Sequence, residues 1–90
     1  MIIKFEDLFV EQFNTILTHI SHDKKSVAYD FKRSVQRKIA LLKEHPLMCR
    51  KSYYFEDKAY RDLIHHGYTV IYKVEKERII ILEIFKWQNR

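Results

Sequence analysis

The sequence predicts an α+β fold whose elements follow the order β-α-α-β-β-β. A short apolar segment opens the chain, two segments with helical periodicity follow it, and the last third alternates as strands do around the single glycine. Helices that precede a run of strands, instead of alternating with them, are typical of α+β domains. We therefore expect the N-terminal strand and a helical hairpin to pack on one face of a C-terminal antiparallel sheet.

The first predicted strand and the first predicted helix follow one another closely. Residues 1–5 are apolar apart from Lys4, which predicts a short strand. Asp7 is a suitable N-cap for the helix after it. In this helix, apolar residues recur at spacings of 4, 3, 1 and 3 and form one face: Phe9, Phe13, Ile16, Leu17 and Ile20. We expect the opening strand to pair with an edge of the C-terminal sheet.

A second helix is predicted directly after the first. Residues 21–23 interrupt the first helix, and Asp23 is expected to cap the second. The second helix has an apolar stripe at spacings of 4, 4, 4 and 3, formed by Val27, Phe31, Val35, Ile39 and Leu42. Pro46 ends it. Because the break between the helices is short, they should form an antiparallel hairpin.

The stretch between the second helix and the sheet is the least defined part of the chain. Within residues 47–58, the segment 51–55 fits an edge strand or an ordered loop equally well. From Ala59 onward a strand pattern is clear. In the strand after Gly67, alternate residues fall on one face: Tyr68, Val70, Tyr72 and Val74.

The last predicted strand is the most apolar segment of the chain. Residues 75–77 are polar and too few for anything but the turn of an antiparallel hairpin. Residues 79–85 are apolar on both faces apart from Glu83. This pattern is typical of a central strand that is covered on both sides.

Composition limits the kind of protein. Ninety residues suffice for one hydrophobic core, so residues 1–90 are predicted to form a single domain. No apolar stretch approaches the roughly 20 residues of a membrane span, and the lone Cys49 fits a reducing cytoplasm. We expect a cytoplasmic protein with no membrane contact, metal or cofactor.

His65 and His66 lack further ligands at metal spacing and are interpreted as polar turn residues.

The basic charge of the chain is concentrated in one segment. Residues 24–44 contain seven basic and two acidic residues and so carry the whole net charge of +5. A clustered basic face indicates an anionic partner, either an acidic protein segment or nucleic acid. Lys32, Arg33 and Arg37 are the candidate contacts. The alternative interpretation is a helix face that is merely solvated.

Several short segments together resemble a known group of proteins. They are Tyr60-Arg61-Asp62-Leu63, Gly67-Tyr68, Val70-Ile71-Tyr72 and the strand ending in Phe85-Lys86. In this order the chain resembles, over nearly its whole length, the RelE/ParE superfamily of type II toxin–antitoxin toxins. The resemblance implies a plasmid-stabilising, growth-inhibiting toxin that a cognate antitoxin neutralises within a hetero-oligomer. In the RelE branch the toxin cleaves mRNA on the ribosome, and in the ParE branch it inhibits DNA gyrase.

A RelE-type nuclease needs cations at the scissile phosphate and a group for proton transfer. Here Arg61, Lys86 and Arg90 could supply the cations. Thr69 and Trp87 stand where the resemblance would place arginines, and no tyrosine follows the last strand. Arg61 could equally form a structural ion pair with Asp62 or Glu56. The ribosome-dependent mRNA endonuclease is therefore kept as the alternative, and inhibition without hydrolysis is favoured.

The end of the chain resembles the ParE branch more closely. Its residues Phe85-Lys86-Trp87-Gln88-Asn89-Arg90 are similar to the tails common there, although an internal arginine is missing. An aromatic residue flanked by cations is typical of a contact anchor. We therefore expect Lys86, Trp87 and Arg90 to contact the target, with DNA gyrase favoured. A second alternative is a non-toxic, basic nucleic-acid-binding module.

Overall fold

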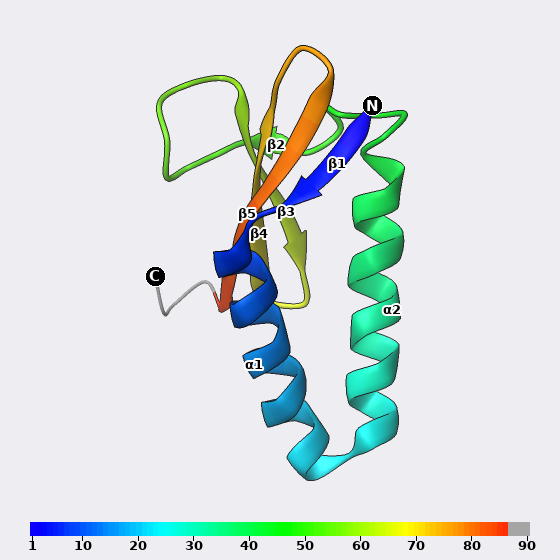
Figure 1. The fold of residues 1–90 in the computed structure, drawn as a ribbon. Helices are drawn as coiled ribbons and strands as arrows, with labels where there is room; N and C mark the ends of the chain where they lie inside the picture. The colour runs from blue at the N-terminus through cyan, green and yellow to red at the C-terminus, as the bar shows by residue number, and fades with distance from the viewer. Residues whose placement is uncertain (87–90) are drawn as a thin grey trace.

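The computed structural model describes residues 1–86, which form a helical hairpin on one face of a five-stranded sheet (Figure 1). The elements in chain order are β1 (Ile2–Phe5), α1 (Asp7–Asp23), α2 (Lys25–Leu41), β2 (Arg50–Lys51), β3 (Tyr60–His65), β4 (Tyr68–Val74) and β5 (Arg78–Lys86). The predicted α+β class and the order of strand, two helices and strands are confirmed.

The sheet is mixed, with the strand order β1-β5-β4-β3-β2. The three long strands β3, β4 and β5 form an antiparallel meander. β1 joins its outer edge in parallel to β5, with Ile2 opposite Arg78. The expected pairing of the opening strand with an edge of the C-terminal sheet is therefore confirmed.

The two helices meet at one residue. Lys24 is extended, with φ −160° and ψ 117°, and is both the C-cap of α1 and the N-cap of α2. Asp23 is the last residue of α1, so its predicted role as the cap of α2 is wrong. The N-cap of α1 is Glu6, so the prediction of Asp7 as that cap is also wrong. Asp7 is the first residue of the helix, where the positive end of the helix dipole stabilises its carboxylate.

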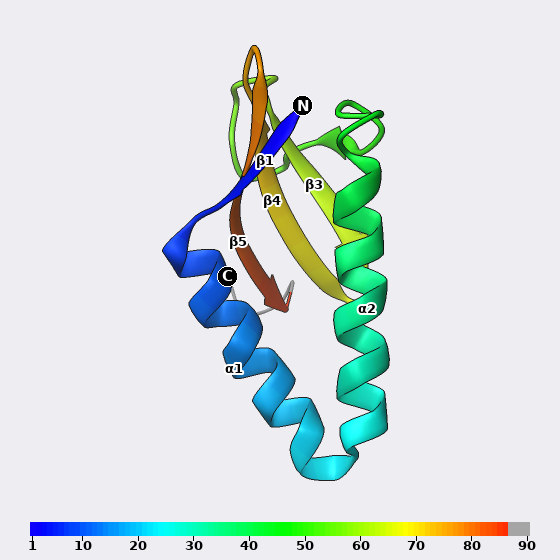
Figure 2. The same cartoon turned by 45° about the vertical axis from the view of Figure 1, so that its right-hand side comes forward.

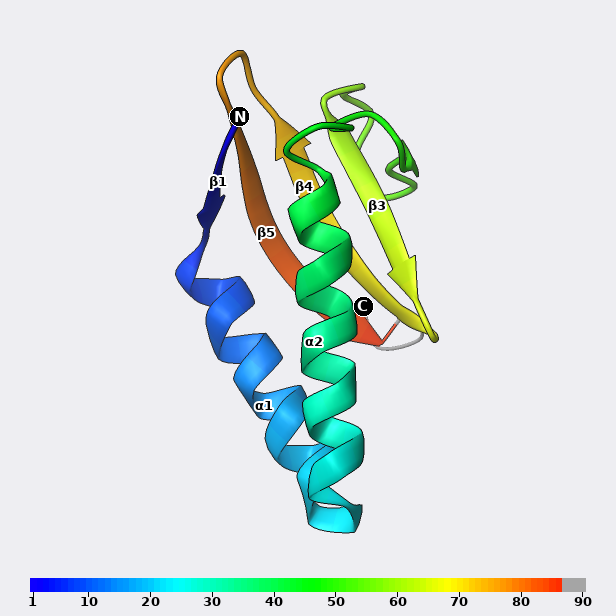
Figure 3. The ribbon, with the colours of Figure 1, turned by 90° about the vertical axis from the view of Figure 1, so that its right-hand side faces the viewer.

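The core lies between the helices and the facing side of the sheet (Figure 2). Its fully buried members include Phe9 of α1, Val35 and Ile39 of α2, and Ile81 of β5. Val27 was predicted on the same stripe of α2 but is 50% exposed. The reason is visible in Figure 3, where the tip of the hairpin extends beyond the sheet and has no strand to cover it.

The opposite side of the sheet is covered by the connection between α2 and β3. Only two of its residues form a strand, in which Arg50 pairs with Asp62. Beyond it, the ring of Tyr54 packs edge-on against Phe85 at 5.3 Å between centroids. Both faces of β5 are therefore covered, as its apolar sequence predicts.

A tight turn joins β3 to β4. His66 and Gly67 both have positive φ, at 46° and 82°, the combination that two-residue hairpins with a right-handed twist require. His66 is exposed, as expected of a turn residue. The same expectation is wrong for His65, which is the last residue of β3 and is only 5% exposed.

Candidate binding surfaces

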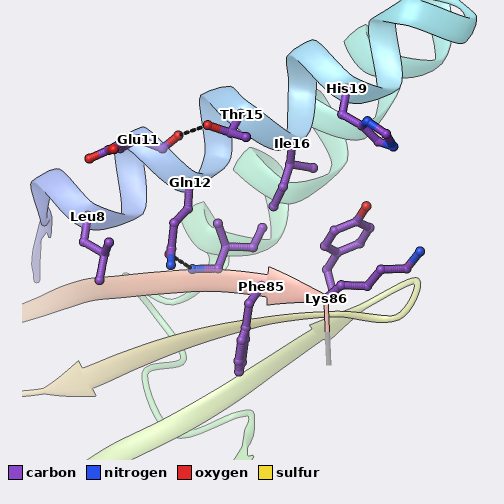
Figure 4. Close-up of a pocket in the computed structure, with 10 residues that line it drawn as sticks. Leu8, Glu11, Gln12, Thr15, Ile16, His19, Phe85 and Lys86 are labelled. Atoms are coloured by element: carbon purple, nitrogen blue, oxygen red, sulfur yellow. Dashed lines mark hydrogen bonds between the residues drawn. The ribbon is translucent and has the colours of Figure 1, made fainter. Parts of the chain in front are cut away.

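An open groove of about 480 Å³ lies between α1 and the C-terminal end of β5 (Figure 4). One wall is a single face of α1, from which Leu8 and Ile16 project. Ile84 and Lys86 of β5 form the other side. The sequence-predicted contact residue Lys86 therefore lies at the edge of a concave surface that the linear pattern did not reveal.

A hydrogen bond between the two walls sets the shape of the groove. β4 and β5 change register where Ile71 pairs with Glu83 and Tyr72 with Ile81, which leaves Leu82 without a partner on β4. Close to this bulge, the backbone N–H of Ile84 donates to Oε1 of Gln12 at 2.8 Å. A side chain of α1 thus satisfies a backbone group of β5, as buried backbone groups require.

A second candidate surface is the basic side of α2. Lys32, Arg33 and Arg37 are all exposed, as the sequence predicts for a docking surface. The guanidinium of Arg33 lies 5.7 Å from the centroid of the Tyr29 ring, which is itself exposed. Because Val35 and Ile39 face the core, this basic side points away from the sheet. It offers several charges to an anionic partner, and Lys32 also lines a small open hollow between α1 and α2.

The candidate nuclease cations do not come together within the described residues. Arg61 pairs across the sheet with Tyr72, whereas Lys86 pairs with Tyr68 at the other end of β4. Four residues along a strand correspond to roughly 13 Å. Arg90, the third candidate, and Trp87 lie outside the described residues.

Arg61 has a visible structural role. Its guanidinium donates to the carbonyl of Lys58 at 3.3 Å and to that of Cys49 at 3.1 Å. Arg61 therefore ties the α2–β3 connection to the start of β3. Asp62, one of its two expected ion-pair partners, pairs with Arg50 instead.

Asp62 binds both Arg50 and Tyr53, and we call this group of three residues the Arg50–Asp62 clamp. It was not predicted from the sequence. The Asp62 side chain is 0% exposed, and Oδ2 accepts hydrogen bonds from Nε and Nη2 of Arg50 at 3.3 and 3.2 Å and from the backbone N–H of Tyr53 at 3.0 Å. The Arg50 guanidinium also lies 3.6 Å from the Tyr53 ring centroid. An arginine and an acid twelve residues apart carry no local signal of pairing. Only the strand register brings them together.

Comparison with known proteins identifies the family. The family model for the ParE toxin of the type II toxin–antitoxin system parDE matches residues 3–88. The chain belongs to the ParE toxin family. No curated protein matched the sequence of this ParE-family chain.

A solved structure with the same fold supports the assignment. It is described as the chromosomal ParDE toxin–antitoxin system from P. aeruginosa and superimposes with a TM-score of 0.77. The match covers 96% of this chain and 95% of that one, at 18% sequence identity. Likeness at this identity shows a shared fold. Together with the family model, it confirms the resemblance to the RelE/ParE superfamily on its ParE side.

The titratable groups in the ParE-type core are arranged as packing residues. Burial raises the pKa of Tyr72, whose hydroxyl donates to the carbonyl of Pro46 at 2.8 Å. Burial also raises the pKa of Cys49, which keeps it as a thiol. Burial lowers the pKa of His65, whose ring packs 5.4 Å from Phe31. These positions favour structural roles for all three side chains.

Residues 1–86 contain no group of three or more His, Cys, Asp or Glu side chains placed to hold a metal ion. In the same part of the chain, neither helix has the length and apolar character that crossing a bilayer demands.

Proposed function

We propose that this ParE-type toxin inhibits growth by binding DNA gyrase and is neutralised by a cognate antitoxin in a cytoplasmic hetero-oligomer. The observation that carries the proposal is the family match, which spans residues 3–88. In this proposal residues 1–90 act as one toxin domain and require no cofactor.

Inhibition by binding, without hydrolysis, is supported by the placement of the cations. In acid–base cleavage of a phosphodiester, all catalytic groups must lie within hydrogen-bond distance of the same scissile phosphate. Arg61 and Lys86 lie at opposite ends of the sheet. Thr69, which stands where the RelE resemblance would place an arginine, is 1% exposed. Thr69 lines a hollow with Arg50 and Tyr53, but a threonine supplies no cation to a scissile phosphate.

Two surfaces have separate roles in this proposal. Lys86, together with Trp87 and Arg90, contacts the target. Lys32, Arg33 and Arg37 on α2 attract an acidic segment of the antitoxin. The separation is supported by the position of Lys86 beside α1, whereas the basic side of α2 turns away from the sheet.

The experiment combines growth with two biochemical assays. The chain is expressed in bacteria alone and together with the small gene that adjoins it. The purified protein is then tested for inhibition of gyrase supercoiling beside a ribosome-dependent mRNA cleavage assay. Growth arrest that the neighbouring gene relieves, with supercoiling inhibited and mRNA intact, is the expected result. Ribosome-dependent cut sites with supercoiling unaffected would replace this proposal by the endonuclease alternative.

A further inference from the structure

β1 is the outermost strand of the sheet, and no other strand within residues 1–86 pairs with its outer edge (Figure 3). On the inner edge, the N–H of Ile2 donates to the carbonyl of Glu77 on the β5 side at 3.3 Å. Because alternate residues of a strand direct their backbone groups to the same neighbour, those of Ile3 and Phe5 point away from β5. An open edge of this kind is a template for pairing with another strand.

Apolar side chains flank the open edge of β1. Ile2 is 71% exposed and Phe5 is 46% exposed. A hollow of about 410 Å³ opens between β1 and α2, where Ile39 and Lys43 line it from the helix. Natural edge strands are commonly protected by proline, by a bulge or by several charges. β1 instead pairs with β5 without a register shift, and Lys4 is its one charged residue.

The edge is complementary to itself in one antiparallel register. Residues whose backbone groups point outward must face one another across such a pair. A pair centred on Ile3 aligns Phe5 of one copy with Met1 of the other. It also sets Ile2 of one copy opposite Lys4 of the other. Centring the pair on Lys4 would set two lysines directly opposite each other, which is unfavourable.

Charged residues near the two ends of β1 are complementary in the same register. Glu6 and Asp7 follow the strand, so each copy brings them to the Met1 end of the other. Lys43 of α2 lines the same hollow as Met1. Among the ion pairs that form within the described part of the chain, none involves Glu6, Asp7 or Lys43. Two carboxylates of one copy therefore approach a lysine of the other, once on each side of a two-fold axis.

We infer that β1 pairs antiparallel with β1 of a second copy of this chain and joins the two sheets into one. The pair centred on Ile3 exchanges backbone hydrogen bonds between the copies, and the apolar side chains at the edge are removed from water. An interface of this isologous type closes as a dimer. The inference does not rest on the proposed function, because it uses none of the residues proposed to contact the target or the antitoxin.

The pairing is tested by two opposite substitutions at one exposed residue of the full-length chain. Ile2→Lys sets a lysine opposite Lys4 of the other copy, whereas Ile2→Glu sets a carboxylate there. Ile64→Lys and Ile64→Glu are the matched controls, since Ile64 is 46% exposed on β3 and both β4 and β5 lie between β3 and β1. Circular dichroism verifies that every variant is folded, and sedimentation equilibrium measures the dissociation constant of the dimer.

Opposite shifts at one position are the expected result. Each substitution acts twice in a symmetric dimer. Ile2→Lys should therefore raise the dissociation constant by about tenfold and Ile2→Glu should lower it by about threefold. Both Ile64 variants should stay within about twofold of wild type. On wild-type protein, amide exchange of Ile3 and Phe5 should slow as the concentration rises through the dissociation constant, because these N–H groups are hydrogen-bonded only in the dimer.

Three outcomes would contradict the inference. A wild-type chain that stays monomeric up to about 1 mM would show that the edge does not hold two copies together. A dimer whose dissociation constant shifts in the same direction in both Ile2 variants, or in neither, is formed by another surface. A monomer whose Ile3 and Phe5 amides are protected only by the purified product of the adjoining small gene would assign the edge to that product, and so overturn the second copy as its occupant.

Discussion

The side chain of Gln12 accepts a hydrogen bond from the backbone N–H of Ile84 at 2.8 Å, between residues 72 positions apart. This bond joins the first helix to the last strand of the ParE-type fold. It lies next to the register shift in which Leu82 loses its partner on β4. The side-chain amide of Gln12 thus accepts the hydrogen bond of a backbone N–H beside the bulge. It also sets the distance between α1 and β5 and so the width of the groove beside Lys86.

Replacing Gln12 by alanine should lower stability through the unpaired Ile84 N–H. An unsatisfied buried donor costs about 1–3 kcal/mol. For a domain of this size, each kcal/mol corresponds to a decrease in Tm of about 4–8 °C. Asn14→Ala, at an exposed position on the same helix, is the control and should leave Tm nearly unchanged. Equal melting temperatures for Gln12→Ala and wild type would show that the bond contributes nothing in solution.

Removing the carboxylate of Asp62 should release the connection that covers the outer face of the sheet. Asp62→Ala leaves the Tyr53 N–H and the Arg50 guanidinium without their shared acceptor. We expect a loss of about 1–3 kcal/mol from the unmet donors, with a small share from the ion pair because the Arg50 side chain is 38% exposed. Limited proteolysis should then cut faster within residues 50–58. Glu56→Ala, in the same exposed stretch, should not change the cleavage rate.

The buried imidazole of His65 should make stability depend on pH. Burial lowers its pKa in the folded state below the value in the unfolded chain, and nearby Lys38 and His66 act in the same direction. The unfolded state therefore binds the proton more readily, so stability is fully present above the unfolded pKa near 6.5 and is lost as pH falls below it. Urea midpoints measured from pH 8 to pH 5 should decline less in His65→Phe than in wild type. The exposed neighbour offers the control, His66→Gln, whose pH profile should follow that of wild type.

Charge reversal on α2 should weaken antitoxin binding in a salt-dependent way. The double variant Arg33→Glu/Arg37→Glu replaces attraction by repulsion at two exposed positions, and exposed charges act mainly on the association rate. We expect the association rate to fall by about tenfold at low salt and the difference to shrink at 0.5 M NaCl, because the Debye length shortens. Surface plasmon resonance with the adjoining gene's product measures both. A defect that persists unchanged at high salt would argue against an electrostatic role for this side of α2.

Much of the fold was predictable because its signals are local. The spacing of Phe9 and Phe13 predicts one face of α1, and the uninterrupted apolar run of residues 79–85 predicts a strand covered on both sides. Each of these patterns repeats within a few residues, so periodicity alone reveals them. The boundary between the helices was less predictable, because Lys24 ends one helix and begins the next without a side-chain cap.

The candidate site depended on contacts that have no local pattern. Lys86 was predicted from its neighbours in the tail, but its place in a groove with Leu8 requires α1 to pack against β5. Arg61 and Lys86 are both candidate nuclease cations in the sequence, and only the strand register shows that they lie at opposite ends of β4. His65 differs from His66 only in being the last residue inside the strand, and that one position decides its burial.

The sequence by itself determined the α+β class, the order of the elements and the superfamily, because hydrophobic periodicity and short motifs encode them within the chain. Only the tertiary structure decided the groove at Lys86, the Arg50–Asp62 clamp and the separation of the candidate cations. These features depend on strand register and on the packing of α1 against β5. Both are set by the joint burial of residues far apart in sequence, so no single segment contains the information.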